Sequence, residues 1–197
     1  MEQEDDYREV EKMVRDSFWN IYRPGAFEHY IVHYLRDDEN FLPNLAYVIE
    51  KDSQIIGHIN YSTGSINHEM DAVVLGPVSI HKDYQNRGFG SKLIEYTLDI
   101  AKNDGIEFVF VIGDENYYHR FGFESASKYG LHLDGTDFNE ECEFFMIKIF
   151  DKSESEIVPG TFYNPEVFDV CQNDVDEFDK EFEYKKKRVL DTQLKEL

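Results

Sequence analysis

One segment of the sequence restricts the fold more than any other: an apolar strand pattern that runs into a glycine-containing loop and then into an amphipathic helix. The strand pattern covers residues 72–80, the loop covers residues 81–90, and the helix is expected from Ser91. Gly88 and Gly90 carry no side chain, so the loop backbone can approach a ligand closely. A helix N-terminus adds free N–H groups and the positive end of the helix dipole, which together suit a pyrophosphate. The segment therefore predicts an α/β domain with a phosphate-binding loop.

Three known phosphate-binding designs place glycine residues in such a loop, and only one matches the spacing here. A P-loop needs Gly-Lys followed by Ser or Thr, whereas residues 90–92 read Gly-Ser-Lys. A dinucleotide fingerprint needs a third glycine at the position that Leu93 occupies. The pattern Gln85-x-x-Gly88-x-Gly90 remains, and it resembles the pyrophosphate loop of the GNAT N-acetyltransferase superfamily.

A second motif further along the chain strengthens this resemblance. Tyr118 stands four residues before Gly122-Phe123, which is similar to the spacing of the tyrosine after the superfamily's fifth strand. Together with residues 75–80, this segment looks most like the YhbS-type branch of predicted acetyltransferases. The resemblance extends over residues 7–168, and the two motifs together are specific.

The resemblance implies the GNAT (acyl-CoA N-acyltransferase) fold, an α/β fold. In it, flanking helices cover a mixed, mostly antiparallel sheet that is splayed between its fourth and fifth strands. This domain is expected over residues 1–170, and residues 171–197 are expected to form a charged, partly helical extension. In the family the splay admits the pantetheine arm, so acetyl-CoA is the implied co-substrate. The implied contact residues are Val78, Ser79, Ile80, Gln85, Asn86, Arg87, Gly88, Phe89, Gly90, Ser91, Asn116, Tyr117 and Phe121.

The implied reaction is direct transfer of an acetyl group from acetyl-CoA to a primary amine of a small molecule or peptide, without a metal. By the resemblance, Tyr118 is the catalytic residue that protonates the leaving thiolate. A strand amide such as that of Val78 or Ser79 would stabilise the oxyanion. No general base stands out. The candidates are Glu28, His58, Glu69 and water-mediated deprotonation.

The sequence departs from the family pattern in two places. Members usually begin with a strand before the first helix, but only residues 1–6 precede the helical pattern here, so that strand is expected to be short or missing. Many members also carry an asparagine seven residues before the catalytic tyrosine. Val111 holds that position, and Asn116 is the nearby asparagine that could replace it.

The periodicity of the rest of the chain predicts alternating helices and strands. Helices are expected over residues 7–21, 27–35, 91–103 and 117–121, and strands over residues 45–50, 54–63, 72–80, 108–112 and 143–150. Proline has no N–H for a sheet, so the third strand should be bulged or split at Gly76-Pro77. Residues 174–197 are predicted to be weakly helical. Their basic run 185–188 is interpreted as a solvated helix face, with a docking patch as the alternative.

Charge and cysteine usage narrow the partners and the compartment. The formal net charge is −21, which disfavours nucleic acid and favours a cationic small molecule or basic peptide. Two cysteines and the absence of a signal-peptide or membrane-spanning pattern predict a cytoplasmic protein. His29 and His33 are four residues apart, but the glutamate of a zinc-protease motif is missing, so no metal is expected. A homodimer is left open.

Two other functions compete with acetyl transfer. The chain could be an acyl-CoA-binding sensor or interaction protein with the same fold and no useful turnover, because no base is visible. It could instead be a Rossmann-type nucleotide binder in which Asp114 holds the ribose, and it would then bind NAD rather than CoA.

Overall fold

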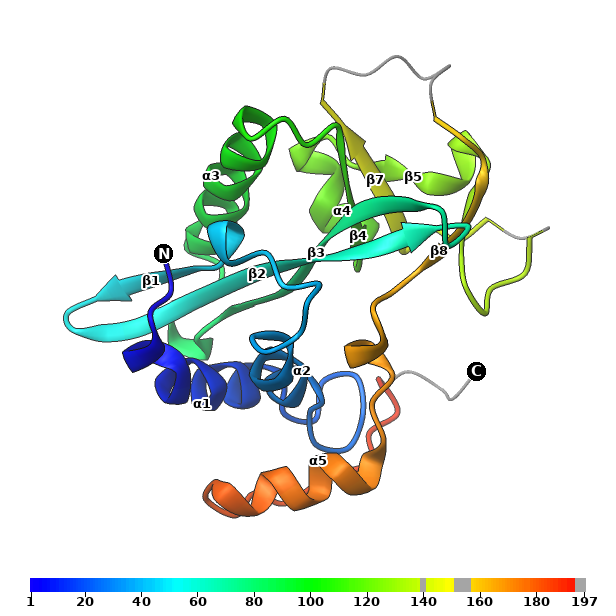
Figure 1. Cartoon of the computed structure of the whole chain (residues 1–197). Coiled ribbons are helices and arrows are strands. Elements are labelled where there is room, and N and C mark those ends of the chain that lie inside the picture. The colour runs from blue at the N-terminus through cyan, green and yellow to red at the C-terminus, as the bar shows by residue number, and fades with distance from the viewer. Residues whose placement is uncertain (139–140, 151–156, 194–197) are drawn as a thin grey trace.

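The computed structural model describes residues 1–138, 141–150 and 157–193, and Figure 1 shows their arrangement. Their helices are α1 (Tyr7–Phe18), α2 (Glu28–Leu35), α3 (Phe89–Asn103), α4 (Glu115–Tyr118) and α5 (Gln172–Phe178). Their strands are β1 (Tyr47–Lys51), β2 (Gln54–Ile66), β3 (Met70–Ile80), β4 (Phe108–Ile112), β5 (Glu124–Ser125), β6 (Leu131–Leu133), β7 (Phe145–Ile149) and β8 (Gly160–Tyr163). None of the helices in these ranges has the length and apolar character needed to span a bilayer.

The strands form one mixed sheet in the order β5-β7-β4-β3-β2-β8-β6, and β1 pairs with β2 outside that path. The β3–β4 and β6–β8 pairs are parallel, and the other pairs are antiparallel. This confirms the mixed, mostly antiparallel sheet that the sequence predicts. It also removes the Rossmann alternative, because a doubly wound fold needs a mostly parallel sheet.

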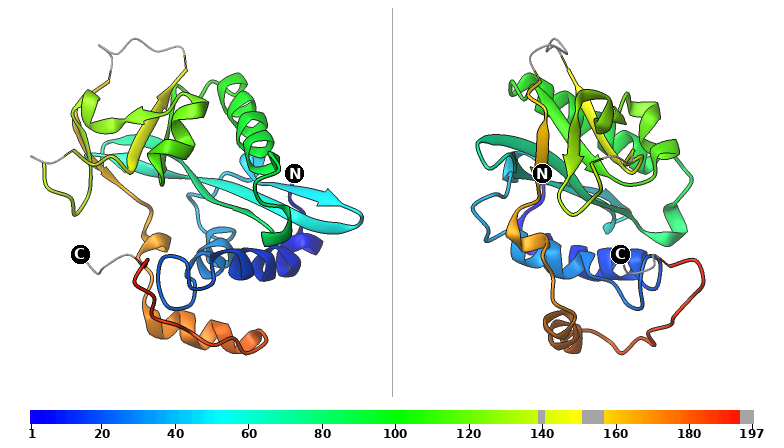
Figure 2. Two further views of the ribbon diagram at one scale, coloured as in Figure 1. Left: turned by 180° about the vertical axis from the view of Figure 1, so that it is seen from behind. Right: turned by 90° about the vertical axis from the view of Figure 1, so that its right-hand side faces the viewer.

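The helices cover the sheet on both faces. α3 and α4 lie on one side, and α1 and α2 lie on the other (Figure 1). α5 and the chain that follows it lie outside α1 and α2 as a further layer (Figure 2). Each face of the sheet has its own buried apolar residues; those under α3 include Ile59, Tyr61, Leu75, Leu93, Ile94, Leu98 and Phe123, and those under α1 include Val10, Met13, Val14, Val32 and Ile55.

Two helices differ from their expected ends because of residues with positive φ. α1 ends at Phe18 rather than near Ile21, and Asn20 then turns the chain at φ 62°. α3 begins at Phe89, two residues before Ser91, because Gly88 adopts φ 81° immediately in front of it. A left-handed conformation is accessible to glycine without strain, so Gly88 fixes the direction in which the helix starts.

The expected break in the third strand is a bulge within a continuous β3. The pairing register of β2 against β3 shifts between Ile59 and Tyr61, opposite Gly76 and Pro77. The short helix expected over residues 117–121 is instead α4 followed by a 3-10 turn at His119–Phe121. In front of α1, residues 1–6 form no strand; they contain a 3-10 turn at Glu4–Asp6.

The C-terminal residues are helical in one part, as predicted, but the interpretation of their basic run is wrong. Helix α5 ends at Phe178 and a 3-10 turn covers Asp179–Glu181, but residues 182–190 contain neither helix nor strand. The basic run 185–188 is therefore not a solvated helix face. Lys185 and Lys187 form ion pairs with carboxylates of α1 and α5, so the run contacts its own chain. The last part of the predicted helix, residues 194–197, lies outside the described residues.

Candidate active site

The site is organised by the short pairing between β3 and β4. These two parallel strands pair only from Val73 to Leu75 on β3 and from Val109 to Val111 on β4. Beyond Leu75, β3 continues to Ile80 while pairing only with β2. The strands therefore separate, and one edge of β3 is left without a strand partner. This is the splay that the sequence predicts between the family's fourth and fifth strands.

The register of β2 shows which main-chain groups of β3 face the splay. His81 and Ile56 form a hydrogen-bonded pair, because the N–H of His81 donates to the Ile56 carbonyl. Ser79 and His58 are the second pair along from it, so they are hydrogen-bonded as well. Antiparallel partners alternate between hydrogen-bonded and non-hydrogen-bonded pairs, so the main-chain groups of Ser79 point towards β2. Those of Val78 and Ile80 then point away from β2, towards the splay. Of the two amides considered for an oxyanion, only that of Val78 faces it.

The loop that follows β3 presents unpaired backbone to solvent. Gln85, Asn86, Arg87 and Gly88 are exposed, and both Asn86 (φ 58°) and Gly88 (φ 81°) are left-handed. Gly88 is the N-cap of α3, no side chain caps the helix, and its first turn carries no acidic residue. The first N–H groups of a helix have no partner within the helix. The end of α3 next to the splay is therefore electropositive and open to an anion.

The Gln85 side chain has a structural contact of its own. Its Nε2 donates to the Ile80 carbonyl at 3.0 Å, and Ser17 Oγ of α1 donates to the same oxygen at 3.1 Å. Both hydrogen bonds hold the end of β3 against the loop and α1. Any contact of Gln85 with a phosphate would therefore use its backbone N–H rather than its side chain.

Gly90 is the point where β3, α3 and α4 meet. A Cβ at this position would lie 2.8 Å from the Tyr117 hydroxyl and 3.5 Å from Ile80 Cγ1. Tyr117 in turn packs edge-on against Tyr118, with ring centroids 5.2 Å apart, and against Phe121 at 5.5 Å. The aromatic group that the sequence places at the end of the pantetheine arm is thus adjacent to the start of α3.

Tyr118 is held rigidly at the end of the splay. Asp114 caps α4 by accepting from the Asn116 N–H at 3.0 Å, and the ring of Tyr118 lies so close to Gly113 that a Cβ there would be 2.6 Å from Cε2. The side chain is buried, at 8% exposure. Burial raises the pKa of the Tyr118 hydroxyl, and the neighbouring phenols of Tyr117, Tyr22 and Tyr61 raise it further.

The Tyr118 hydroxyl differs from that of the other deeply buried tyrosine beside it. The Tyr61 hydroxyl is hydrogen-bonded to Thr97 Oγ1 at 2.8 Å, whereas the Tyr118 hydroxyl has no hydrogen-bond partner among the described residues. The phenol is therefore protonated at neutral pH and its donor is unused. A protonated phenol with a free donor can hydrogen-bond to the sulfur of a leaving group and protonate it, although the raised pKa makes it a weaker acid than an exposed tyrosine.

Tyr22, in the loop before α2, lies close enough to Tyr118 to raise its pKa, and Glu28, the first residue of α2, acts in turn on Tyr22. Burial raises the pKa of Tyr22, and the charges of Glu28 and Asp114 raise it further. Burial also raises the pKa of the Glu28 carboxyl, although the N–H groups of Glu28 and Phe27 and the charge of Arg23 lower it. Oε2 of Glu28 accepts from the Phe27 N–H at 2.9 Å. A half-buried carboxylate with a raised pKa suits a general base.

The other candidate bases lie elsewhere. His58 is fully buried on β2, where Nε2 lies 3.4 Å from Glu2 Oε1. Glu69 is exposed in the turn before β3, and a rise of about 3.3 Å per residue places it roughly 30 Å from Val78. Asn116 is exposed and its Nδ2 donates to Asp114 Oδ1 at 3.2 Å. Glu28 is therefore the candidate that the structure brings, through Tyr22, to the tyrosine cluster of Tyr22, Tyr117 and Tyr118.

The two histidines of α2 are paired with carboxylates. His29 Nε2 lies 3.0 Å from Asp179 Oδ1, and His33 Nδ1 lies 2.7 Å from Glu11 Oε1. These contacts connect α2 to α1 and to the C-terminal residues. Sequence reasoning missed Asp179 and Tyr22, because their partners are far away along the chain and no motif marks them.

Comparison with known proteins agrees with this geometry. The profile of the Acetyltransferase (GNAT) family matches residues 12–123. The chain therefore belongs to the GNAT acetyltransferase family. The uncharacterized N-acetyltransferase YjhQ of Escherichia coli K12 is 32% identical over 100 residues, which are 49% of this chain and 55% of YjhQ. The uncharacterized N-acetyltransferase YhbS of the same strain is 30% identical over 123 residues, which are 62% of this chain and 70% of YhbS.

Two similar crystal structures contain a coenzyme. That of E. coli YhbS in complex with CoA has a TM-score of 0.74 and 26% identity, and the match covers 86% of this chain and 89% of that one. That of a GNAT family acetyltransferase from Brucella melitensis in complex with acetyl-CoA has a TM-score of 0.68 and 26% identity, over 85% of this chain and 94% of that one. The chain spans just over half the length of YjhQ and more than two thirds of YhbS.

Proposed function

We propose that this protein transfers the acetyl group of acetyl-CoA to a primary amine by direct attack of the amine on the thioester. The observation that carries the proposal is the hydroxyl of the buried Tyr118, which has an unused donor and lies where β3 and β4 separate. The two CoA-containing relatives support a coenzyme A thioester as the co-substrate.

The phosphate end of the co-substrate is assigned to the start of α3. The backbone N–H groups of residues 85–91 offer unpaired donors, and the Arg87 guanidinium adds positive charge beside them. The pantetheine arm is assigned to the free edge of β3, where the main-chain groups of Val78 and the N–H of Ile80 point into the splay; the Ile80 carbonyl already accepts from Gln85 and Ser17. Asn116, Tyr117 and Phe121 are assigned to its thioester end.

The chemistry follows from three groups around the splay. Glu28 takes a proton from the amine, so that its lone pair can form the new C–N bond. The N–H of Val78 stabilises the oxyanion that forms on the carbonyl oxygen. As the C–S bond breaks, Tyr118 donates its proton to the sulfur, and the products are an amide and a free thiol.

Charge favours a cationic acceptor. The chain carries 41 acidic and 20 basic side chains. Close to the site, the carboxylates of Glu28 and Asp114 both raise the pKa of Tyr22. A negative field concentrates positively charged molecules near the site. We therefore assign the acceptor to polyamines, basic amino acids, aminoglycosides or basic peptides.

A thiol-release screen tests the proposal. Purified protein is incubated with acetyl-CoA and one acceptor from each of these four classes, and free CoA thiol is followed with a chromogenic disulfide. The proposal predicts thiol release that depends on one class of amine. Binding of CoA with no thiol release for any amine would instead favour the acyl-CoA sensor.

A further inference from the structure

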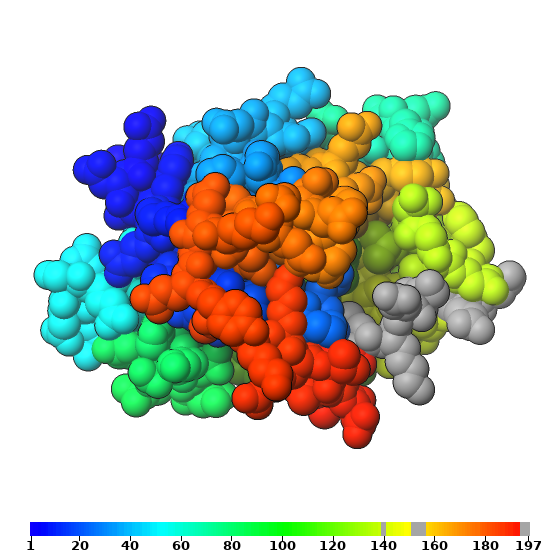
Figure 3. Space-filling view, turned by 90° about the horizontal axis from the view of Figure 1, so that it is seen from below, coloured from blue at the N-terminus to red at the C-terminus, as the bar shows by residue number. Residues whose placement is uncertain are grey.

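The residues after α5 form a strap that crosses the N-terminal helices. We call residues 182–193 the C-terminal strap and residues 19–27, between α1 and α2, the acceptor loop. The space-filling view from below shows the orange-to-red C-terminal residues lying across the blue N-terminal ones (Figure 3). The strap contains neither helix nor strand, so it is held in place by contacts with other elements rather than by helical hydrogen bonds.

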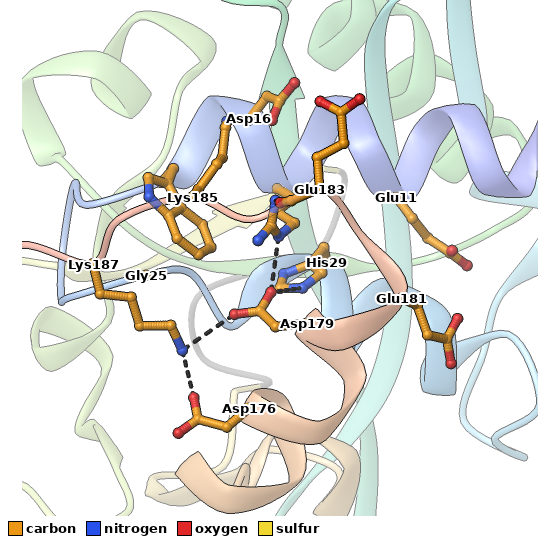
Figure 4. A network of polar contacts seen from close by, with 12 residues as sticks. Glu11, Asp16, Gly25, His29, Asp176, Asp179, Glu181, Glu183, Lys185 and Lys187 are labelled. Carbon is orange, nitrogen blue, oxygen red and sulfur yellow. Dashed lines mark hydrogen bonds and ion pairs between the residues drawn. The ribbon is translucent and has the colours of Figure 1, made fainter.

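A single carboxylate, that of Asp179, joins the strap to both N-terminal helices (Figure 4). Its Oδ1 lies 2.8 Å from Arg15 Nε of α1 and 3.0 Å from His29 Nε2 of α2. Its Oδ2 lies 3.1 Å from Lys187 Nζ of the strap. The side chains of Asp179, Arg15 and His29 are 10%, 4% and 0% exposed. A buried charge needs such partners, and removing one of them leaves the rest uncompensated.

The pKa shifts of Asp179 and His29 agree with these contacts. Burial alone would raise the pKa of Asp179, but hydrogen bonds from His29, Arg15 and Lys187 outweigh it and hold that pKa well below its usual range. Burial lowers the pKa of His29. Further out, Lys187 pairs with Asp176 and Lys185 pairs with Asp16, so the strap is fixed at both α5 and α1.

Past Lys185, the strap bonds directly to the acceptor loop. The Lys186 carbonyl accepts from Trp19 Nε1 and from Asn20 Nδ2, both at 3.2 Å. The Arg188 N–H donates to Asn20 Oδ1 at 3.0 Å. The Lys187 side chain lies over Gly25, where a Cβ would be 3.1 Å from its Cε.

The acceptor loop is closed on itself and leads straight to the site. Asn20 and Gly25 exchange hydrogen bonds, from the Asn20 N–H to the Gly25 carbonyl at 2.8 Å and from the Gly25 N–H to Asn20 Oδ1 at 3.0 Å. Tyr22 lies within the closed loop, and Glu28 follows its end as the first residue of α2. Glu28 acts electrostatically on Tyr22, and Tyr22 acts on Tyr118.

We infer that Asp179 and the C-terminal strap position the acceptor loop, so that they set how the amine is oriented without touching it or acetyl-CoA. Asp179 is a positioning residue, acting through Lys187 and Asn20 on Tyr22 and Glu28. The inference rests on the proposed function, since it assigns the acceptor side of that same site. It predicts that loosening the strap weakens use of the amine and leaves the acetyl-CoA side, on α3 and α4, unchanged.

The test compares two charge reversals in the full chain. Lys187→Glu places a negative charge beside Asp176 and Asp179 and should repel the strap. Lys180→Glu is the matched control: Lys180 pairs with the exposed Glu177, at 67% and 73% exposure, and the change in net charge is the same. The contribution of total charge to the steering of a cationic acceptor is therefore the same in both variants.

Three readouts separate positioning from general damage. Lys187→Glu should lower kcat/KM for the amine by roughly tenfold, because a small misplacement of a reacting group costs rate steeply. Its Kd for acetyl-CoA should remain within about twofold of wild type. Trp19 is the only tryptophan, so its emission should shift in Lys187→Glu, where it loses the Lys186 carbonyl, and not in Lys180→Glu. Asp179→Asn, which keeps the shape but removes the charge, should act in the same direction.

The possible outcomes are distinct. If wild type acetylates an amine and the two lysine variants have equal kcat/KM for it, the strap does not position the loop and the inference is wrong, while the proposed function stands. The inference is also wrong if Lys187→Glu weakens acetyl-CoA binding as much as amine use. If wild type acetylates no amine at all, the proposed function fails and the inference falls with it.

Discussion

The two sides of the β3–β4 splay are built by different means. On the side of α3 and α4, the site consists of backbone: the free edge of β3, the left-handed Gly88 and the uncapped start of α3. On the side of α1 and α2, it consists of side chains held by charge, and Asp179 is separated from Arg15 by 164 residues. Backbone donors do not depend on side-chain identity, so they suit a coenzyme that is the same in every reaction. Side chains can be replaced by mutation, so a side-chain network suits the acceptor, which can differ from one enzyme to another.

The largest expected effect lies where the two sides meet, at Tyr118. Tyr118→Phe keeps the buried ring and removes only the hydroxyl. It should lower kcat by roughly 10²-fold or more, with acetyl-CoA affinity nearly unchanged, because the leaving thiolate loses its proton donor. Steady-state kinetics and calorimetry measure the two quantities.

Tyr117→Phe is the control for Tyr118, since Tyr117 is its neighbour on α4 and carries the same functional group. Tyr117→Phe should lower kcat much less than Tyr118→Phe does. Equal kcat for wild type and Tyr118→Phe, under conditions where chemistry limits the rate, would make Tyr118 a packing residue and assign protonation to solvent.

A smaller effect is expected on the acceptor side, at Glu28. Glu28→Gln should lower kcat/KM for the amine by roughly 10²-fold or somewhat less, since water can partly replace a base. The base acts as a carboxylate, so activity falls as pH drops through its pKa. Burial raises that pKa above the ordinary 4.5, so the fall should begin at higher pH than for an exposed glutamate. A pH–rate profile of Glu28→Gln that keeps this acidic limb would exclude Glu28 as the base.

The coenzyme side is tested at Gly88. Saturation of wild type with CoA at about 100 times its Kd should stabilise the fold by roughly 2.7 kcal/mol. Gly88→Val should abolish this stabilisation, because valine avoids the left-handed conformation that directs the loop amides towards the ligand.

Gly105→Val is a matched control: Gly88 and Gly105 have φ of 81° and 83°, and a Cβ added to either would meet no atom within 4 Å. Gly105, however, follows the far end of α3. Equal CoA-induced shifts in the two variants would remove the phosphate assignment.

The smallest effect concerns charge at long range. If the negative surface steers a cationic amine, kcat/KM should fall by a few-fold as ionic strength approaches about 0.5 M, where the Debye length is only a few Å. A neutral acceptor measured in the same series should show no such fall. If kcat/KM for the cationic amine does not change with ionic strength, the negative surface does not steer the amine, and only charges within the site act on it.

The two sides also differ in how much the sequence reveals. Gly88, Gly90 and Tyr118 belong to motifs of a few consecutive residues, and the structure places all three around the splay. The strands β2 and β3 are predictable because they are long and rich in β-branched and aromatic residues, and β4 because all five of its residues are apolar. The very short strands β5 and β6 are missed, because two or three residues carry no readable period.

The acceptor side could not be predicted in the same way. The run at residues 185–188 has the composition of a solvated helix face, and nothing local shows that Lys187 pairs with Asp179. From the sequence alone, Glu28, His58 and Glu69 are equal candidates for the general base. Only the fold distinguishes Glu28, by placing it beside Tyr22. Contacts between residues more than about a hundred positions apart depend on topology, which single-sequence periodicity does not encode.

The central claim is that the acetyl group passes from acetyl-CoA to an amine at this splay. The most direct measurement uses acetyl-CoA with an isotope-labelled acetyl group and the amine that supports thiol release, with both products quantified by mass spectrometry. The account predicts one labelled amide for each CoA thiol formed, at a rate that Tyr118→Phe reduces. Thiol without labelled amide, or CoA-induced stabilisation without either product, would contradict it.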